Sequence, residues 1–261
     1  MDQGISKKLE EMIQKRIASS QGSTQEYRCS ECHDTGWIGF RDENGIRYER
    51  KCECRLAREA EEKLQASGLA DALKEQTFDS FRTDNAMQKN IKRVASEYVV
   101  ALFERWDTPR RPWLYIGGNP GSGKTHICTA VCGDILRHNI GVKYMHWVTE
   151  SKKLKFTRDE EYEDLVDEYT NPTVLYIDDL LKQKYTENAV FTESDIRIAF
   201  SILDARYQMN KPTIISTEWD LINQLLPADE GVFSRVYERS KEFTVRISRD
   251  QKYNFRMKEG E

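Results

Sequence analysis

Residues 118–125, Gly-Asn-Pro-Gly-Ser-Gly-Lys-Thr, match the pattern G-x-x-x-x-G-K-[ST] and constrain the fold more than any other stretch. A strand-like apolar run at residues 113–116 precedes this glycine loop, and residues 126–137 carry apolar side chains at helical spacing. Such a loop curls so that its N–H groups face phosphate oxygens, and the helix that follows adds its dipole. We expect Lys124 to reach the β and γ phosphates of a nucleotide and the Thr125 hydroxyl to bind Mg²⁺. A glycine-rich turn with a chance lysine is the simpler alternative, but the order of strand, loop and helix argues against it.

Residues 174–179, Val-Leu-Tyr-Ile-Asp-Asp, form a second motif, an apolar strand that ends in two acids. Strands alternate with helical stretches around it, which predicts an α/β fold with a parallel sheet covered by helices on both faces. Ligands bind at the carboxyl ends of such strands, so we expect Asp178 to lie beside the glycine loop and to hold Mg²⁺, directly or through water. Asp179 stands where many ATPases carry a glutamate that polarises the attacking water. The shorter aspartate predicts slow hydrolysis; a helix cap after a core strand is the alternative.

Four of the six cysteines form two close pairs, Cys29 with Cys32 and Cys52 with Cys54. A predicted hairpin, with its turn at residues 43–45, separates the pairs. This arrangement is typical of zinc ribbons and knuckles, whose thiolates complete a tetrahedral Zn²⁺ site. The second pair is C-x-C rather than C-x-x-C, so His33 is an alternative ligand, and four free thiols are the alternative without metal. Cys128 and Cys132, in the helix after the glycine loop, are expected to be core thiols.

The length of 261 residues suggests one or two domains, and we place a boundary near residue 75, giving residues 1–75 and 76–261. A net charge of −4 provides no global basic field, so any contact with nucleic acid needs a local patch. No apolar run is long enough to span a bilayer and the N-terminus lacks a signal peptide, which predicts a cytoplasmic protein. Residues 5–17 form an amphipathic helical pattern that either packs on its own domain or docks onto a partner.

Four stretches in order carry a resemblance to a known family. They are the glycine loop, the acidic strand, Ala-Arg-Tyr at 205–207 before Lys-Pro-Thr-Ile-Ile at 211–215, and Ser-Arg-Val-Tyr-Glu at 234–238. Together they resemble bacterial or phage replicative helicase loaders of the DnaC/DnaI type, within the AAA+ ATPases. The resemblance covers most of residues 75–248, and the cysteine-bearing unit is similar to the zinc-binding, helicase-facing domain of the DnaI type. It implies an AAA+ P-loop domain that lacks the C-terminal helical lid, since only a short polar stretch follows Ile247.

Carried onto this chain, the resemblance implies site residues for ATP or ADP. The nucleotide-binding set is Gly118, Asn119, Pro120, Gly121, Ser122, Gly123, Lys124, Thr125, His126 and Thr217. The strand that senses the γ-phosphate commonly ends in Ser-Asn, whereas Thr217-Glu218 stands here, so either residue is a candidate for that role. Arg235 matches an arginine finger that reaches a neighbouring subunit's nucleotide; a plain surface arginine is the alternative. The family's helix for single-stranded DNA would lie within residues 149–169, where Lys152, Lys153, Lys155 and Arg158 form either phosphate contacts or a solvated face.

The leading functional hypothesis is an ATP-dependent loader that delivers a hexameric replicative DNA helicase onto single-stranded DNA during replication. In it, residues 1–75 bind the helicase and ATP bound between subunits orders a transient assembly. A transposition helper ATPase shares the ATPase core but is expected to lack the cysteine module. The third hypothesis is a zinc-containing adaptor that uses nucleotide as a switch without significant hydrolysis.

Overall fold

The computed structural model describes residue 27 and residues 29–43, 45–182, 191–250 and 253–255. The chain forms two compact units, residues 1–58 and 59–261. This division precedes the boundary near residue 75 expected from the sequence, because residues such as Leu69, 2% exposed, pack into the core of the second unit. The helix expected at residues 5–17 lies outside the described residues. Within the described part of the chain, no helix is long and apolar enough to cross a membrane.

The first unit contains the expected hairpin, formed by antiparallel strands β1 (Trp37–Arg41) and β2 (Arg47–Lys51). Its turn is closed by Asp42, whose Oδ1 accepts a hydrogen bond of 2.8 Å from the Ile46 N–H, while Gly45 supplies a φ of 80°. Almost every strand residue is exposed. An isolated two-stranded hairpin without a buried face is marginally stable, so this unit needs another source of stability. Helix α2 (Glu53–Ala66) follows β2 directly and continues past the division between the units.

The second unit is built on a five-stranded parallel sheet in the order β4-β5-β6-β3-β7. The expected fold class, a parallel sheet between layers of helices, is thereby confirmed. In chain order its elements are α3 (Ala72–Glu75), α4 (Ala86–Glu104), β3 (Leu114–Gly118), α5 (Lys124–Arg137), β4 (Val142–His146), α6 (Trp147–Phe156), α7 (Asp159–Thr170), β5 (Val174–Asp178), α8 (Glu193–Gln208), β6 (Thr213–Thr217), η1 (Leu221–Leu225), α9 (Leu226–Ala228), α10 (Glu230–Ser240), η2 (Lys241–Phe243) and β7 (Thr244–Ile247).

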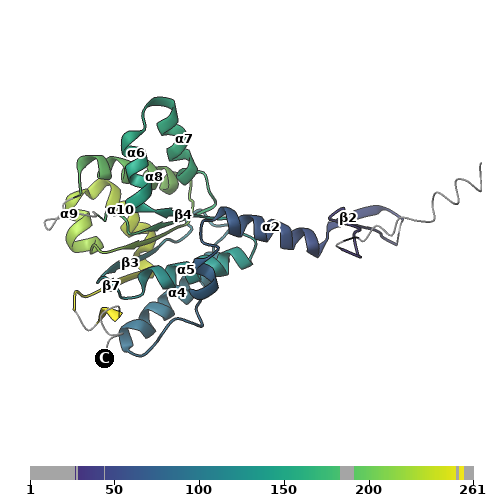
Figure 1. Cartoon of the computed structure of the whole chain (residues 1–261), viewed down its shortest axis with the longest axis horizontal. Coiled ribbons are helices and arrows are strands. Elements are labelled where there is room, and N and C mark those ends of the chain that lie inside the picture. The colour runs from purple at the N-terminus through teal and green to yellow at the C-terminus, as the bar shows by residue number, and fades with distance from the viewer. Residues whose placement is uncertain (1–26, 28, 44, 183–190, 251–252, 256–261) are drawn as a thin grey trace, which may run out of the picture. The chain divides into compact units, whose positions relative to one another are not determined.

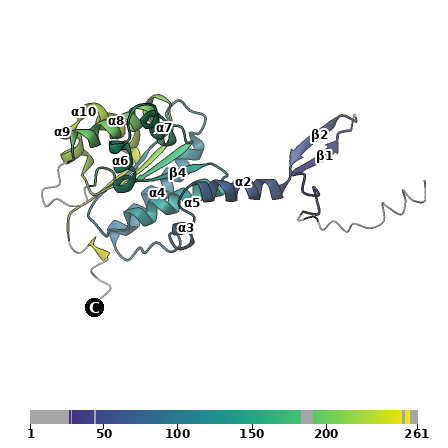
Figure 2. The same cartoon turned by 45° about the horizontal axis from the view of Figure 1, so that its top comes forward.

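Both faces of the sheet are buried, as the continuous apolar strands require. Leu114 and Ile116 of β3 belong to the core formed with α4 and α5. Tyr115, between them in the sequence, belongs to the second core, formed with α6, α7, α8 and α10. The two helical layers are visible on opposite sides of the sheet in Figure 1 and Figure 2. In the sheet, β3 lies between β6 and β7, while the chain passes from β3 to the edge strand β4. This switch in strand order opens a crevice at the carboxyl ends of the strands.

At the start of strands β5 and β6, Arg206 of α8 acts as a buried clamp. Its side chain is fully buried and donates hydrogen bonds to Pro212 O at 2.6 Å, Pro172 O at 2.9 Å and Thr213 Oγ1 at 2.9 Å. Desolvation lowers the pKa of Arg206 to about 9. These hydrogen bonds hold the starts of β5 and β6 in place. The carboxyl ends of the same two strands carry the acidic motif and the expected γ-phosphate sensor.

Candidate functional site

The glycine loop takes a tight curl that only glycine permits at two of its positions. Gly118 and Gly123 have φ angles of 122° and 89°. A Cβ on Gly118 would lie 2.0 Å from Ile247 O, and one on Gly123 would lie 3.0 Å from the Phe81 ring. The loop is thus pressed between the end of β7 and the segment before α4, with no room for side chains on these two sides.

Lys124 opens α5 and is 6% exposed. Its Nζ donates hydrogen bonds to the carbonyls of Gly118 at 2.9 Å and Asn119 at 2.8 Å, so the side chain folds back over the loop. Desolvation lowers the pKa of Lys124, although the nearby carboxylates of Glu218 and Asp179 oppose this effect. Among the described residues, the hydrogen bonds of this buried ammonium go to backbone carbonyls of the loop, which it can exchange for a more strongly charged acceptor.

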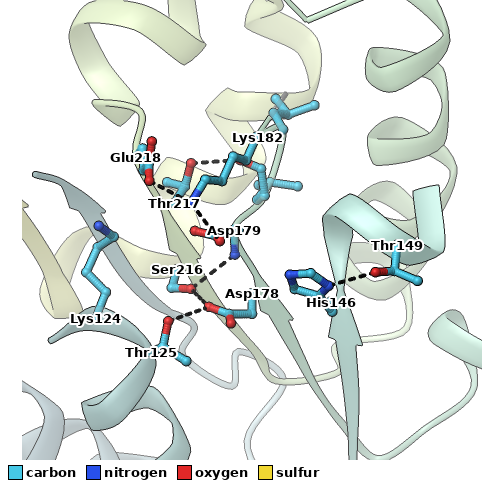
Figure 3. Close-up of polar contacts among 12 residues, drawn as sticks. Lys124, Thr125, His146, Thr149, Asp178, Asp179, Lys182, Ser216, Thr217 and Glu218 are labelled. Atoms are coloured by element: carbon cyan, nitrogen blue, oxygen red, sulfur yellow. Dashed lines mark hydrogen bonds and ion pairs between the residues drawn. The ribbon is translucent and has the colours of Figure 1, made fainter. Parts of the chain in front are cut away.

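Asp178, at the end of β5, is 4% exposed and is surrounded by hydroxyl groups. Thr125 and Tyr176 donate to its Oδ1 at 3.1 Å and 2.8 Å, and Tyr144 donates to its Oδ2 at 3.1 Å. Ser216 of β6 also donates to Oδ1 (Figure 3). Desolvation raises the pKa of both tyrosines, which keeps them protonated as donors. The structure thus brings Asp178 and Thr125 together, as the sheet topology led us to expect.

Lys182 forms ion pairs with two carboxylates that directly follow β5 and β6, those of Asp179 and Glu218. Its Nζ lies 2.7 Å from Glu218 Oε1 and 3.0 Å from Asp179 Oδ2 (Figure 3). Although desolvation opposes it, the hydrogen bond to Glu218 and the charge of Asp179 raise the pKa of Lys182. Asp179 itself adopts a left-handed φ of 58°, a conformation that is rare outside glycine and clusters at functional sites. Lys182 belongs to none of the motifs recognised in the sequence.

The two candidates for the sensor at the end of β6 are placed differently. Thr217 is fully buried, and its hydroxyl donates a hydrogen bond of 2.7 Å to Leu180 O. Glu218 lines the pocket next to Lys182. The geometry therefore places the Glu218 carboxylate, rather than the Thr217 hydroxyl, on the wall of the pocket.

These groups meet in a pocket of about 460 Å³, a size that suits a nucleotide. It is lined by Gln76, Gly121, Ser122, Gly123, Lys124, Thr125, His126, Tyr144, His146, Asp178, Asp179, Lys182, Glu218 and Phe255. Of the residues expected from the sequence, Gly118, Asn119, Pro120, Thr217 and Arg235 are not among the lining residues. Gln76, Tyr144, His146 and Phe255 line it without having been expected there.

Two segments far apart in the sequence are anchored on the glycine loop. His126 Nε2 lies 3.0 Å from Thr77 O and 3.2 Å from Ser80 Oγ, which ties the segment before α4 to the start of α5. After β7, the Phe255 N–H donates to Gly121 O at 3.0 Å, and Asn119 Nδ2 donates to Asp250 O at 3.1 Å. The described residues after β7 contain no α-helix, but they run against the loop.

Arg235 lies on α10, outside the pocket of its own chain. Its Nε is 2.8 Å from Asp204 Oδ1 on α8, and its guanidinium lies over the ring of Tyr207 at 5.8 Å. Arg239, one turn further on, donates to Asn210 Oδ1 at 2.9 Å and to Tyr207 O at 3.1 Å. Arg235 also donates to Gly231 O, and both arginines are half-buried.

The basic stretch expected to contact DNA is only partly available for such contacts. Lys153 pairs with Glu150 at 2.8 Å, and Lys155 pairs with the buried Asp195 at 2.6 Å. Lys152 and Arg158 are exposed and form no ion pair with any described residue. The ring of Phe156 between them in sequence is 85% exposed. Two unpaired cations and an exposed aromatic ring therefore remain from this stretch.

In the first unit, the four cysteines of the two pairs come together. Their Sγ atoms all lie within 4.8 Å of one another, with Cys29 and Cys52 at 3.7 Å and Cys32 and Cys54 at 3.4 Å. A tetrahedral zinc with Zn–S bonds of about 2.3 Å requires sulfurs about 3.8 Å apart, so the set fits this metal.

The local structure explains how the short C-x-C spacing is accommodated. Cys52 directly precedes α2 and Cys54 lies in its first turn, so the chain changes direction between the two sulfurs. The Gly36 N–H donates to Cys32 Sγ at 3.3 Å, as is usual for a thiolate in a metal knuckle. The ring of His33 packs against Tyr27 instead, 4.6 Å between centroids, and His33 is not part of the cluster. Cys128 and Cys132 are fully buried in α5, and desolvation raises the pKa of both thiols.

A glycine loop and an acidic strand end that meet in one pocket of a parallel sheet define a P-loop nucleotide-binding protein. The IstB-like ATP binding proteins match residues 22–228, and the chain belongs to this family. It is 30% identical over 231 residues to the phage-like element PBSX protein XkdC of Bacillus subtilis strain 168, covering 87% of this chain and 85% of that protein.

Solved structures with the same fold include replication proteins. The DnaC helicase loader matches with a TM-score of 0.52 at 21% identity, over 67% of this chain and 99% of that one. The replication initiator DnaA, bound to AMPPCP and single-stranded DNA, matches with a TM-score of 0.52 at 18% identity, over 70% of this chain and 52% of that one. These structural matches show a shared fold. The chain spans about half the length of the DnaA chain. The expected resemblance to DnaC-type proteins is confirmed at the level of family and fold.

Proposed function

We propose that this protein is an ATP-dependent loader that delivers a hexameric replicative helicase onto single-stranded DNA. The observation that carries the proposal is the meeting of Thr125 and Asp178 in a nucleotide-sized pocket. The fold shared with a DnaC helicase loader and the separate cysteine-clustered unit support loading over other uses of the same ATPase core.

In this proposal each pocket residue has a chemical task. Lys124 exchanges the carbonyls of Gly118 and Asn119 for the β and γ phosphates of ATP. Thr125 and Asp178 are the residues that would hold Mg²⁺, which neutralises phosphate charge when bound. Asp179 orients the attacking water. The loop amides and the start of α5 bind the remaining phosphate oxygens.

The position of Lys182 favours slow hydrolysis. An ammonium 3.0 Å from Asp179 Oδ2 pairs with that carboxylate and competes with the attacking water for it. The aspartate is also one methylene shorter than the glutamate of many ATPases. Slow turnover suits a switch, in which bound ATP holds an assembly together until hydrolysis or DNA contact releases it.

Three parts of the chain contact the helicase, the single-stranded DNA and a neighbouring subunit in this proposal. The cysteine cluster, with zinc, would stabilise a unit whose hairpin has little buried surface, and this unit presents the helicase-binding surface. Exposed Phe156 with Lys152 and Arg158 offers stacking and charge to single-stranded DNA. Arg235 reaches the nucleotide of a neighbouring subunit when chains self-associate.

Co-migration with the replicative helicase in gel filtration, with Mg-ATP or Mg-ADP, tests loading. We expect a stable complex with ATP and release with ADP, and transfer of helicase onto a fluorescent single strand only with hydrolysable ATP. Lys124→Ala should abolish the ATP dependence. Absence of a helicase complex with either nucleotide, with the protein folded and ATP bound, contradicts the proposal.

A transposition helper ATPase is the second candidate, because the matching family is that of IstB-like proteins. In that case the chain would bind a transposase and DNA, and no helicase. A nucleotide-switched adaptor is the third, favoured by the Lys182–Asp179 contact. ATP turnover that is negligible both with and without single-stranded DNA would support the adaptor.

A further inference from the structure

Gln76 and Phe255 line the nucleotide pocket but belong to neither the glycine loop nor the acidic strand end. Asp178, Asp179, Lys182 and Glu218 gather where Mg²⁺ and the γ-phosphate belong. The phosphates therefore occupy that end together with the glycine loop, and Gln76 and Phe255 are left to contact the base.

The residue after Gln76 and the backbone of Phe255 contact the elements that bind phosphate. Gln76 caps the C-terminus of α3, its N–H donating 2.8 Å to Ala72 O, and the next residue contacts His126 of α5. The Phe255 N–H donates to Gly121 O within the glycine loop. Side chains fixed to the loop in this way keep their positions relative to a nucleotide whose phosphates lie on that loop.

The carboxamide of Gln76 has unused hydrogen-bonding capacity. Its Oε1 is buried and accepts no hydrogen bond from any described residue, although the side chain lines the pocket. A buried acceptor without a donor is unfavourable, and the terminal amide torsion of glutamine is broad enough to turn the group toward a ligand. The missing partner is thus a hydrogen-bond donor carried by whatever fills the base end of the pocket.

We propose that Gln76 reads the base and makes the pocket selective for adenine, with Phe255 stacking on the base. Adenine presents a donor, the N6 amino group, beside an acceptor, N7, and a carboxamide pairs with both at once. Guanine presents two acceptors at these positions, so the Gln76 carbonyl would remain unpaired against O6. The proposal rests on nucleotide binding by residues 118–125, as proposed above, and adds the residues that select ATP over GTP.

Competition binding with the full-length chain tests this without any turnover. Dissociation constants for Mg-ATP, Mg-GTP and Mg-ITP are measured by displacement of a fluorescent ATP analogue. ITP keeps the O6 of guanine and lacks its 2-amino group, so it separates hydrogen bonding from size. We expect the parent to bind ATP roughly tenfold or more tighter than either GTP or ITP, from one bidentate contact.

Substitutions of single residues test which side chain makes the pocket prefer ATP over GTP and ITP. Gln76→Met, similar in size, should weaken ATP binding roughly tenfold and leave GTP and ITP almost unchanged. Phe255→Leu should weaken all three nucleotides together, because every base has a face on which to stack. Gln208→Met, on the exposed end of α8, is the matched control and should change nothing. Equal thermal midpoints establish that each variant is folded.

Equal affinity of the parent for ATP, GTP and ITP overturns the base-reading role of Gln76 while leaving nucleotide binding intact. A uniform loss of all three in Gln76→Met overturns it as well, since that outcome describes a structural residue. Failure of the folded parent to bind any nucleotide overturns both this inference and the proposed ATP site.

Discussion

The Thr125 hydroxyl donates a hydrogen bond of 3.1 Å to Asp178 Oδ1, so the first turn of α5 and the end of β5 meet at one carboxylate. This contact joins the two motifs that are 53 positions apart in the sequence. It also places a hydroxyl and a carboxylate, both oxygen ligands that Mg²⁺ prefers, side by side at the pocket.

Asp178→Asn should reduce Mg-dependent ATP hydrolysis by about 10- to 100-fold, because the amide keeps the shape of the group but loses its charge. Nucleotide binding measured without Mg²⁺ should change little. Turnover and Mg²⁺ titration check the prediction, with Asp164→Asn on the exposed face of α7 as control. Parent-like turnover by Asp178→Asn would show that this residue does not serve the metal.

Lys182→Met should weaken nucleotide binding, since it leaves the carboxylates of Asp179 and Glu218 uncompensated beside the phosphates. The raised pKa of Lys182 keeps it charged at neutral pH, so the full charge is lost. We expect a rise in Kd of about tenfold. Adding Glu218→Gln removes one uncompensated charge and should recover part of the loss, which a double-mutant cycle measures. Identical Kd values in the parent, both single variants and the double variant would exclude an electrostatic role for Lys182.

Zinc should be present at one ion per chain, held by the four clustered cysteines. Metal analysis of freshly purified protein measures it, and Cys52→Ser should lose the metal together with protection of the hairpin amides from exchange. Cys128→Ala, which removes a fully buried thiol of the second unit, is the control and should keep the metal. A zinc-free parent, purified without chelators, would refute the site.

Motifs confined to a few consecutive residues were predictable from the sequence, and so was the sheet they imply. Asp178 and Thr125 could be placed together because parallel strands end at one edge of a sheet. The resemblance implied one helix within residues 149–169, whereas the structure has two in this region, α6 and α7, and α6 begins earlier, at Trp147. Trp147 is fully buried, and a tertiary contact of this kind is not visible in a local sequence pattern.

Gln76, Lys182 and Phe255 were not predictable as pocket residues, for a different reason. Each reaches the pocket through contacts between segments far apart in the chain, and none belongs to a local pattern. The hydroxyls around Asp178 are an intermediate case. Tyr144 and Tyr176 are paired in register on β4 and β5, so a sheet alignment would have suggested them once the strand order was known.

Arg235→Ala should leave nucleotide binding by single chains nearly intact and lower both ATPase activity and ATP-dependent self-association. In its own chain Arg235 pairs with Asp204, and a role at the neighbouring site exchanges that carboxylate for the γ-phosphate. A finger in trans contributes on the order of 10³-fold or more in known cases, and we expect less here because Asp179 and Glu218 are atypical. Arg197→Ala on the exposed face of α8 is the control.

Mixing Arg235→Ala with Lys124→Ala chains separates a role in trans from a structural one. Some mixed interfaces combine an intact glycine loop with an intact Arg235, so activity should partly return. Absence of recovery at every ratio, with assembly confirmed, would favour Arg239 or a purely structural Arg235.

Titration of the full-length chain with Mg-ATP by calorimetry, for the parent and for Lys124→Ala, tests most directly whether residues 118–125 form the nucleotide site. We expect one site per chain in the parent and a Kd raised roughly 10- to 100-fold in Lys124→Ala, from loss of a charged hydrogen bond. Lys89→Ala, on the exposed face of α4, should bind like the parent. Equal affinity of the parent and Lys124→Ala, or no binding by the folded parent, would contradict a nucleotide site at this loop.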